Sequence, residues 1–395
     1  MAELLAPAGN LEKLKIAFAY GADAAYMGLD EFSLRANAGN FTRDDLAEVV
    51  ALKRKSGKKL YCALNILFHE GQIEDLRRRL GEIREWPFDA FIVSDMGAAK
   101  VLRDVWKNDV ELHLSTQASC TNSEACKVYR SLGFKRVILG RETPIGDIRR
   151  IRDANPDLDL EVFVHGAMCM AYSGRCLLSS FLVGRSGQQG DCAHACRWHY
   201  RLEEQERPGE WYPIEEEKGY TTILSSKDLC MIDHLQDLED AGVSSFKIEG
   251  RMKSPYYVAA VTRAYRKVMD RDPDAASYRE DIFNVSHRPY CTGFFYGQGP
   301  VSTMEGGSYI RDYTFCGMIG DEVRPHVYSL DLRNQIKLGE QIEYLDPSRP
   351  TMVDTHFKLL DSSFEYVDQI DHCKVQYLET QEPVSKGDII RRLNQ

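Results

Sequence analysis

The chain has 395 residues, eleven cysteines and a formal net charge of −10 at pH 7. This length allows two domains or one large barrel with an additional small domain. The net negative charge argues against a broad basic surface for binding nucleic acid, though not against a local basic groove. The opening MAELLAPAGN shows no secretory signal, and no stretch reaches the roughly 18 apolar residues of a membrane span, so we expect a cytoplasmic protein without membrane contact.

Apolar runs of strand length alternate with segments of helical periodicity along most of the chain. The predicted helices include Asn10–Tyr20, Asp44–Lys55, Ile73–Arg84 and Glu124–Ser131. Near-continuous apolar strands suit a parallel sheet covered on both faces, and eight βα units predict a (β/α)8 TIM-like barrel. A doubly wound open sheet is the alternative, but LAPAGN is not its G-x-G-x-x-G turn. The eight predicted strands are Glu3–Ala6, Ala24–Leu29, Lys59–Asn65, Ala90–Ser94, Glu111–Thr116, Arg136–Leu139, Leu160–His165 and Ser244–Ile248.

The alternation is interrupted twice. The segment from about residue 197 to residue 225 is rich in polar and aromatic residues, which predicts a small antiparallel insertion after strand seven. After the predicted helix Tyr256–Met269 the rhythm ends, and short β-like runs separated by Gly, Pro, Asp and Asn predict a small all-β, barrel-like domain. We therefore expect a barrel domain over 1–305 and a β domain over 306–395.

Four cysteines share one short segment rich in Gly, Ser and Gln. Cys169, Cys176, Cys192 and Cys196 have the spacing C-x6-C-x15-C-x3-C. In a reducing compartment such a group favours metal binding over disulfides, and four thiolates suit an iron–sulfur cluster or a structural zinc ion. Ordinary reduced thiols are the third interpretation. Cys230, which follows the insertion, is an alternative fourth ligand.

Polar residues follow most of the predicted strands. Because the functional residues of a parallel barrel gather at the C-terminal ends of its strands, we expect these side chains and the cysteine segment to face one cavity. Simpler roles stay open: Asn10 and Asp95 could cap helices, and His165 could be a wall residue. The residues at these ends are Asn10, Asn65, Asp95, Gln117, Arg141, Glu142, His165, Glu249 and Arg251.

Four motifs resemble the collagenase-like peptidase family of unassigned mechanism. They are ELLAPAGN, the four-cysteine segment, SSKDLC and FKIEGRMKSPYYVAAV, and the resemblance covers essentially the whole chain. Better-understood members resemble anaerobic hydroxylases of a tRNA wobble uridine, a ribosomal RNA cytidine or a quinone ring. The β domain and the ACRW segment are most similar to the tRNA branch.

The resemblance implies a 4Fe-4S cluster on the four cysteines, tRNA as substrate and prephenate as co-substrate. Prephenate carries two carboxylates, so guanidinium groups should bind it, and Arg35, Arg141 and Arg251 are the candidates. His165 and Glu249 are the predicted proton carriers. Asn65, Gln117 and Glu142 are predicted to line the substrate site. An electron donor and a partner subunit of the same family are further expected partners.

Three other functions remain open at this point. A peptidase is weakly supported, since the chain has no G-x-S-x-G elbow and His69–Glu70 lacks the second histidine of a zinc helix. Hydroxylation of a ribosomal RNA cytidine is the second alternative. A noncatalytic RNA-binding module is the third.

Overall fold

The computed structural model describes residues 1–29, 32–33, 41–107, 109–169, 171–198, 202–203, 211–212, 225–297, 301–302, 309–372 and 374–394. The chain divides into two compact units. One comprises Met1–Leu14, Asp23–Met252 and Arg288–Ser308, and the other Lys15–Ala22, Lys253–His287 and Tyr309–Gln395.

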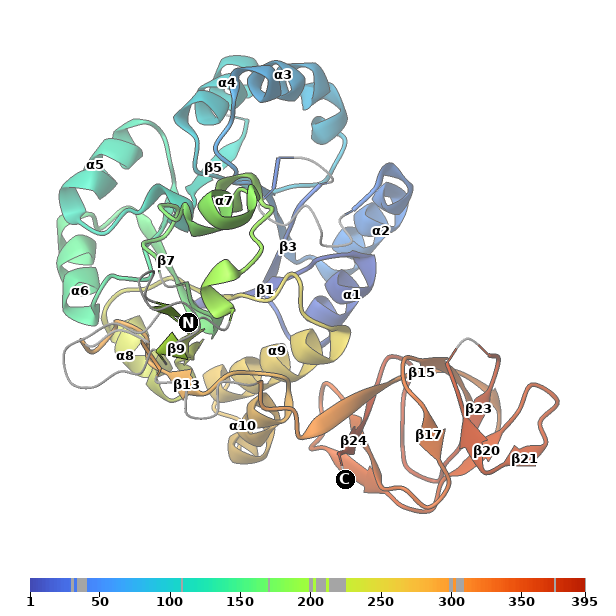
Figure 1. Cartoon of the computed structure of the whole chain (residues 1–395). Helices are drawn as coiled ribbons and strands as arrows, with labels where there is room; N and C mark the ends of the chain where they lie inside the picture. Colours follow the sequence, from blue (N-terminus) through green and yellow to red (C-terminus); the bar gives the residue numbers. More distant parts are fainter. Residues whose placement is uncertain are drawn as a thin grey trace. The chain divides into compact units, whose positions relative to one another are not determined.

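Eight parallel strands in the first unit form a closed ring (Figure 1). The last strand pairs in parallel with the first and with the seventh, which closes the barrel. The strand residues are almost all buried, as expected for a parallel sheet covered by helices. The predicted TIM-like barrel is therefore confirmed. Its strands are β1 (Glu3–Pro7), β2 (Ala24–Met27), β3 (Lys59–Leu64), β4 (Ala90–Val93), β5 (Glu111–Leu114), β6 (Arg136–Ile138), β7 (Asp159–Ala167) and β12 (Ser245–Ile248).

Helices between the strands surround the ring in Figure 1. Two strand-end residues start helices: the Asn10 carboxamide accepts a hydrogen bond from the Lys13 N–H, and the Asp95 carboxylate accepts one from the Ala98 N–H. Thr42 and Asp45 form a capping box before α2. The helices are α1 (Leu11–Ala19), α2 (Leu46–Ser56), α3 (Glu70–Arg84), α4 (Met96–Trp106), α5 (Ser123–Ser131), α6 (Ile145–Ala154) and α8 (Leu235–Asp240).

Strand β7 is longer than its neighbours, and its end carries additional strands. Beyond the barrel pairing, β11 (Asp228–Cys230) joins β7 antiparallel, and β13 (Tyr290–Cys291) joins β11. The cysteine segment that follows β7 contains the short helix α7 (Leu178–Val183) and the 3-10 turns η3 (Gly187–Gln189) and η4 (Ala195–Arg197). The predicted antiparallel insertion is represented among the described residues by β8 (Leu202–Glu203) and β9 (Trp211–Tyr212). A further antiparallel pair is formed by β10 (Ser225–Ser226) and β14 (Val301–Ser302).

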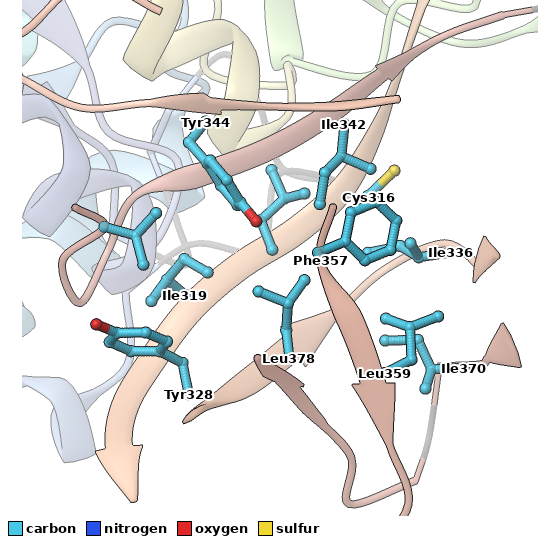
Figure 2. Packing of buried hydrophobic residues seen from close by; sticks show 12 residues of the cluster. Cys316, Ile319, Tyr328, Ile336, Ile342, Tyr344, Phe357, Leu359, Ile370 and Leu378 are labelled. Atoms are coloured by element: carbon cyan, nitrogen blue, oxygen red, sulfur yellow. The ribbon is translucent and has the colours of Figure 1, made fainter. Parts of the chain in front are cut away.

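The second unit combines α9 (Pro255–Met269) and α10 (Ala275–Asn284) with an antiparallel β domain. Its eight-stranded sheet has the order β19-β18-β24-β15-β16-β23-β20-β21, and β17 pairs with β22. Figure 2 shows the apolar core between these strands, where Ile342, Tyr344 and Leu378 are completely buried. The predicted all-β domain is confirmed. Its strands are β15 (Tyr313–Arg324), β16 (Val327–Leu332), β17 (Ile336–Lys337), β18 (Ile342–Leu345), β19 (Met352–Asp354), β20 (Lys358–Leu360), β21 (Tyr366–Val367), β22 (Gln369–Ile370), β23 (Tyr377–Glu379) and β24 (Ile389–Leu393).

The domain limits of 1–305 and 306–395 stay a prediction. The compact units divide the chain differently, because α9 and α10 belong to the same unit as the β domain. Among the described residues, no helix combines the length and the apolar character needed to cross a membrane.

Candidate functional site

Arg141 and Glu249 come together at the C-terminal ends of β6 and β12. One Arg141 N–H group donates to the Ala167 carbonyl over 2.8 Å, and Arg141 Nη2 lies 4.0 Å from Glu249 Oε2. The guanidinium carbon also lies 4.0 Å from the centre of the Phe163 ring. These contacts fix the guanidinium, while both side chains stay partly exposed. The structure therefore places a predicted anion-binding group beside a predicted proton carrier.

Tyr26 on β2 is a residue of this site that the sequence did not single out. Its hydroxyl lies 3.0 Å from the Ile248 carbonyl and 3.2 Å from Glu249 Oε2, so it can donate to either oxygen. A tyrosine inside an apolar strand is usually a packing residue, and its hydroxyl contact could not be foreseen.

A buried network of charges lies in the barrel interior beneath Tyr26. Lys247 donates to Glu161 over 2.9 Å, and its ammonium lies 4.4 Å from the centre of the Tyr26 ring. Arg136 binds Glu161 at 3.0 Å and Glu3 at 2.6 Å. Burial alone would raise the pKa of Glu161, but Lys247 and Arg136 outweigh it and lower this pKa to about 2. These charges were also missed, because Lys247 and Glu161 occupy single positions in otherwise apolar strands.

Arg251 has a different environment from the one predicted. It is 3 % exposed, and one N–H group donates to the Ser33 hydroxyl over 2.6 Å. A Cβ atom on Gly28 would lie 2.9 Å from the same guanidinium nitrogen. The Arg251 guanidinium thus packs against the loop after β2, and its part in substrate binding stays a prediction. Arg35 lies outside the described residues.

His165 is buried at the end of β7. Its Nε2 atom lies 3.4 Å from the Tyr290 hydroxyl, and its carbonyl accepts a hydrogen bond from the Glu249 N–H. The register of β7 and β11 pairs His165 directly with Cys230. Cys230, the alternative fourth ligand, is therefore a cross-strand neighbour of a predicted catalytic histidine.

Glu142 anchors the cysteine segment. Its carboxylate accepts hydrogen bonds from the Ser173 N–H at 3.0 Å and from the Ser173 hydroxyl at 3.3 Å. The Ser119 hydroxyl donates to the Ser173 carbonyl. Glu142 thus connects the loop after β6 to the cysteine segment, and its predicted contact with substrate is not tested by these bonds.

Asn65 and Gln117 belong to loops in contact with the same segment. The Leu67 N–H, two residues after Asn65, donates to the Gln188 carbonyl over 3.2 Å. A Cβ atom on Gly174 would lie only 2.1 Å from the Gln117 carbonyl oxygen, so the two backbones touch. The loops after β3, β5 and β6 therefore hold the cysteine segment at the C-terminal end of the barrel, as predicted from chain order.

The thiols of this segment are not gathered into a ligand set. Cys169 is exposed, and Cys176, Cys192 and Cys196 are partly exposed. Among the described residues, no three His, Cys, Asp or Glu side chains lie close enough to hold a metal ion. The donor chemistry of the four thiols suits a cluster, and the predicted ligand set stays a prediction.

Comparison with known proteins gives matches over most of the chain. A model of peptidase family U32 matches residues 9–305, and a model of the peptidase family U32 C-terminal domain matches residues 311–391. The tRNA hydroxylation protein P1 of Bacillus subtilis is 36% identical over 380 residues, which cover 94% of this chain and 89% of the relative. The tRNA hydroxylation protein P of Escherichia coli is 34% identical over 391 residues, which cover 87% of this chain and 86% of that relative. The 23S rRNA 5-hydroxycytidine C2501 synthase of Escherichia coli is 38% identical over 268 residues, 68% of this chain and 39% of that protein.

The barrel, the β domain and the two family models that match them lead to one assignment: the chain belongs to peptidase family U32.

Proposed function

We propose that this chain is an RNA hydroxylase, with the wobble uridine of tRNA as its target. The observation that carries the proposal is its similarity, over most of both chains, to relatives named tRNA hydroxylation proteins. A relative named for cytidine hydroxylation in ribosomal RNA supports the same class of reaction, with another RNA as the alternative substrate.

The loops at the C-terminal ends of the barrel strands supply the groups for this chemistry. A single base can enter a barrel only after leaving its stack, and an unpaired anticodon loop makes this easier. Glu249, held by Tyr26 and facing Arg141, is the proposed proton carrier at the base. His165 is the second candidate, since it is buried beside Tyr290.

Prephenate is the proposed co-substrate, and Arg141 is the proposed contact for one of its carboxylates. The Arg141 guanidinium is held by the Ala167 carbonyl and the Phe163 ring, which leaves it partly exposed and oriented. A pre-oriented guanidinium binds a carboxylate with little loss of side-chain freedom.

We further propose that Cys169, Cys176, Cys192 and either Cys196 or Cys230 bind a 4Fe-4S cluster. Such a cluster would supply one-electron redox chemistry that side chains lack. Because no three of these side chains lie together among the described residues, cluster loading requires the cysteine side chains to approach one another, as is common where metal binding is coupled to folding. A reducing, cytoplasmic compartment suits these free thiols.

Deleting the gene tests the proposed function. Mass spectrometry of digested tRNA should show loss of 5-hydroxyuridine and its derivatives, with recovery when the wild-type gene is returned. Unaltered tRNA and ribosomal RNA in a strain that also lacks any paralogue would refute the proposal.

A thiol peptidase is the second candidate function, because Cys230 and His165 are cross-strand neighbours. It predicts that anaerobic, metal-free protein cleaves gelatin and that Cys230→Ala abolishes cleavage. The hydroxylase proposal predicts no cleavage by either protein.

A further inference from the structure

Helix α7, in the middle of the cysteine segment, has its polarity reversed. Ser179 is buried, and its hydroxyl accepts a hydrogen bond from the Ala193 N–H over 2.9 Å. Phe181, two residues later, is 86 % exposed. This short helix buries a serine and exposes a phenylalanine. It therefore lacks the burial of apolar surface that normally stabilises a helix. This arrangement leaves an aromatic ring available to a binding partner.

Several large apolar side chains beside Phe181 are exposed as well. Turn η4 packs against α7, and Trp198, the residue that follows this turn, is exposed. Exposed apolar side chains gathered in this way usually mark an interaction site. We call this surface the α7 patch, and it consists of Leu177, Phe181, Leu182, Val183 and Trp198.

The segment that carries the α7 patch has a charge opposite to that of the chain. Residues 166–198 contain three arginines and one aspartate, a formal charge of +2, whereas the whole chain has −10. Arg175 and Arg185, before and after α7, are both exposed. Arg185 donates to Asp191 with two N–H groups, at 3.1 and 2.8 Å, which fixes its guanidinium. Aromatic rings flanked by arginines are typical of surfaces that bind unpaired nucleic acid.

We propose that the α7 patch is a stacking platform for the unpaired bases that flank the target nucleotide of an RNA loop. The inference rests on the proposed function and adds the surface and the mode of RNA recognition. Phe181 and Trp198 stack on bases, and Arg175 contacts a phosphate. Hydrogen bonds of Ser173 and Gln188 to the loops after β3, β5 and β6 hold the segment that carries the patch at the C-terminal end of the barrel, the end at which Arg141 and Glu249 also lie.

Binding of a labelled anticodon stem-loop, measured by fluorescence anisotropy with the full-length protein, tests the platform. Phe181→Ala and Trp198→Ala should each weaken binding roughly tenfold or more, since base stacking on a ring contributes strongly. Phe181→Tyr keeps a ring and should bind like wild type, whereas Phe181→Leu keeps only apolar surface and should not. Arg175→Gln should make the binding constant less dependent on salt concentration, by the amount expected for the loss of about one phosphate contact.

Two control variants remove exposed apolar side chains elsewhere. Tyr366→Ala on β21 and Leu132→Ala after α5 should leave binding unchanged, because both residues are exposed and neither belongs to the α7 patch. A fully paired RNA of equal length should bind weakly to every variant.

Equal binding of the stem-loop by Phe181→Ala, Trp198→Ala and wild type would overturn the inference. So would a wild-type dimer that Phe181→Ala dissociates without affecting RNA binding, since the patch would then be an interface between copies. Either result leaves the proposed function standing if wild-type protein still restores tRNA modification in the deletion strain. Absence of RNA binding and of restored modification would refute both.

Discussion

Glu161 shows how strongly the barrel interior depends on single charges. The carboxylate is completely buried and neutralised by Lys247 and Arg136. Removing one member of such a network leaves another charge buried without compensation, which costs more than the intact network contributes.

Replacing Glu161 by Gln should therefore lower the free energy of unfolding by about 3 kcal/mol at neutral pH. The pKa of Glu161 is about 2 in the folded protein, below its ordinary value of 4.5, so its contribution is present above pH 4.5 and is lost as the pH falls through 2. Urea unfolding at several pH values should show the difference between wild type and variant shrinking over that interval. Glu124→Gln, which alters an exposed ion pair with Lys127, is the control and should cost roughly 0.5 kcal/mol or less. A pH-independent difference for Glu161→Gln would show that the charge is not responsible.

Arg141 can be tested without removing its charge. Arg141→Lys cannot keep both the bond to Ala167 and a planar contact with a carboxylate, so prephenate should bind more weakly by about 1.5–3 kcal/mol in calorimetry. Arg130→Lys, in an exposed pair with Asp157, should bind prephenate normally. Unchanged affinity in Arg141→Lys would remove this residue from the proposed site.

Chain order alone predicted which residues stand at the strand ends, but not where their side chains go. Arg141 and Glu249 meet, whereas Arg251 packs against Ser33 and Glu142 binds Ser173. These outcomes depend on partners far away in sequence. Tyr26 and Lys247 were missed for the same reason, because only the closed barrel brings them to Glu249 and Glu161.

At the scale of elements, the eight barrel strands could be predicted because each is a short, mostly apolar run. Strands β11 and β13 could not, since they are only three and two residues long and depend on the extension of β7. The cysteine segment was located by its composition, but the hydrogen bonds that hold it to three barrel loops have no local signal.

The docking of that segment depends on Gly174. This residue has φ +78°, and a Cβ atom on it would clash with the Gln117 carbonyl. Gly184 has φ +68° and no neighbour within 4 Å, so Gly184→Ala reproduces the backbone strain without the clash. Gly174→Ala should destabilise docking by roughly 1–3 kcal/mol more than Gly184→Ala. Hydrogen exchange should show faster opening of residues 171–198 in Gly174→Ala alone, and equal protection in both variants would contradict the close contact.

The cluster proposal belongs to the same element. Protein purified without oxygen should contain iron and acid-labile sulfide, and Cys176→Ala should lose both. Comparing Cys196→Ala with Cys230→Ala identifies the fourth ligand, because only the true ligand should be needed. Cys62→Ala, a buried thiol in β3, is the control. Protein that contains one zinc ion per chain and no sulfide would contradict the cluster and support a structural zinc site instead.

At the scale of the whole molecule, the chain joins an acidic barrel unit and an acidic β domain, yet the proposed substrate is a polyanion. The excess positive charge found in residues 166–198 is only +2, so RNA contact should be local and its salt dependence shallow. The two family models cover both parts of the chain.

Direct modification of RNA by the purified protein is the most decisive measurement. Anaerobically prepared protein would be incubated with prephenate and tRNA from the deletion strain, and the wobble nucleoside would be identified by mass spectrometry. The proposed function predicts 5-hydroxyuridine with wild type and with Glu124→Gln, and little or none with Glu249→Gln. Absence of any hydroxylated nucleoside from tRNA and ribosomal RNA, in a preparation that retains its iron and sulfide, would contradict it.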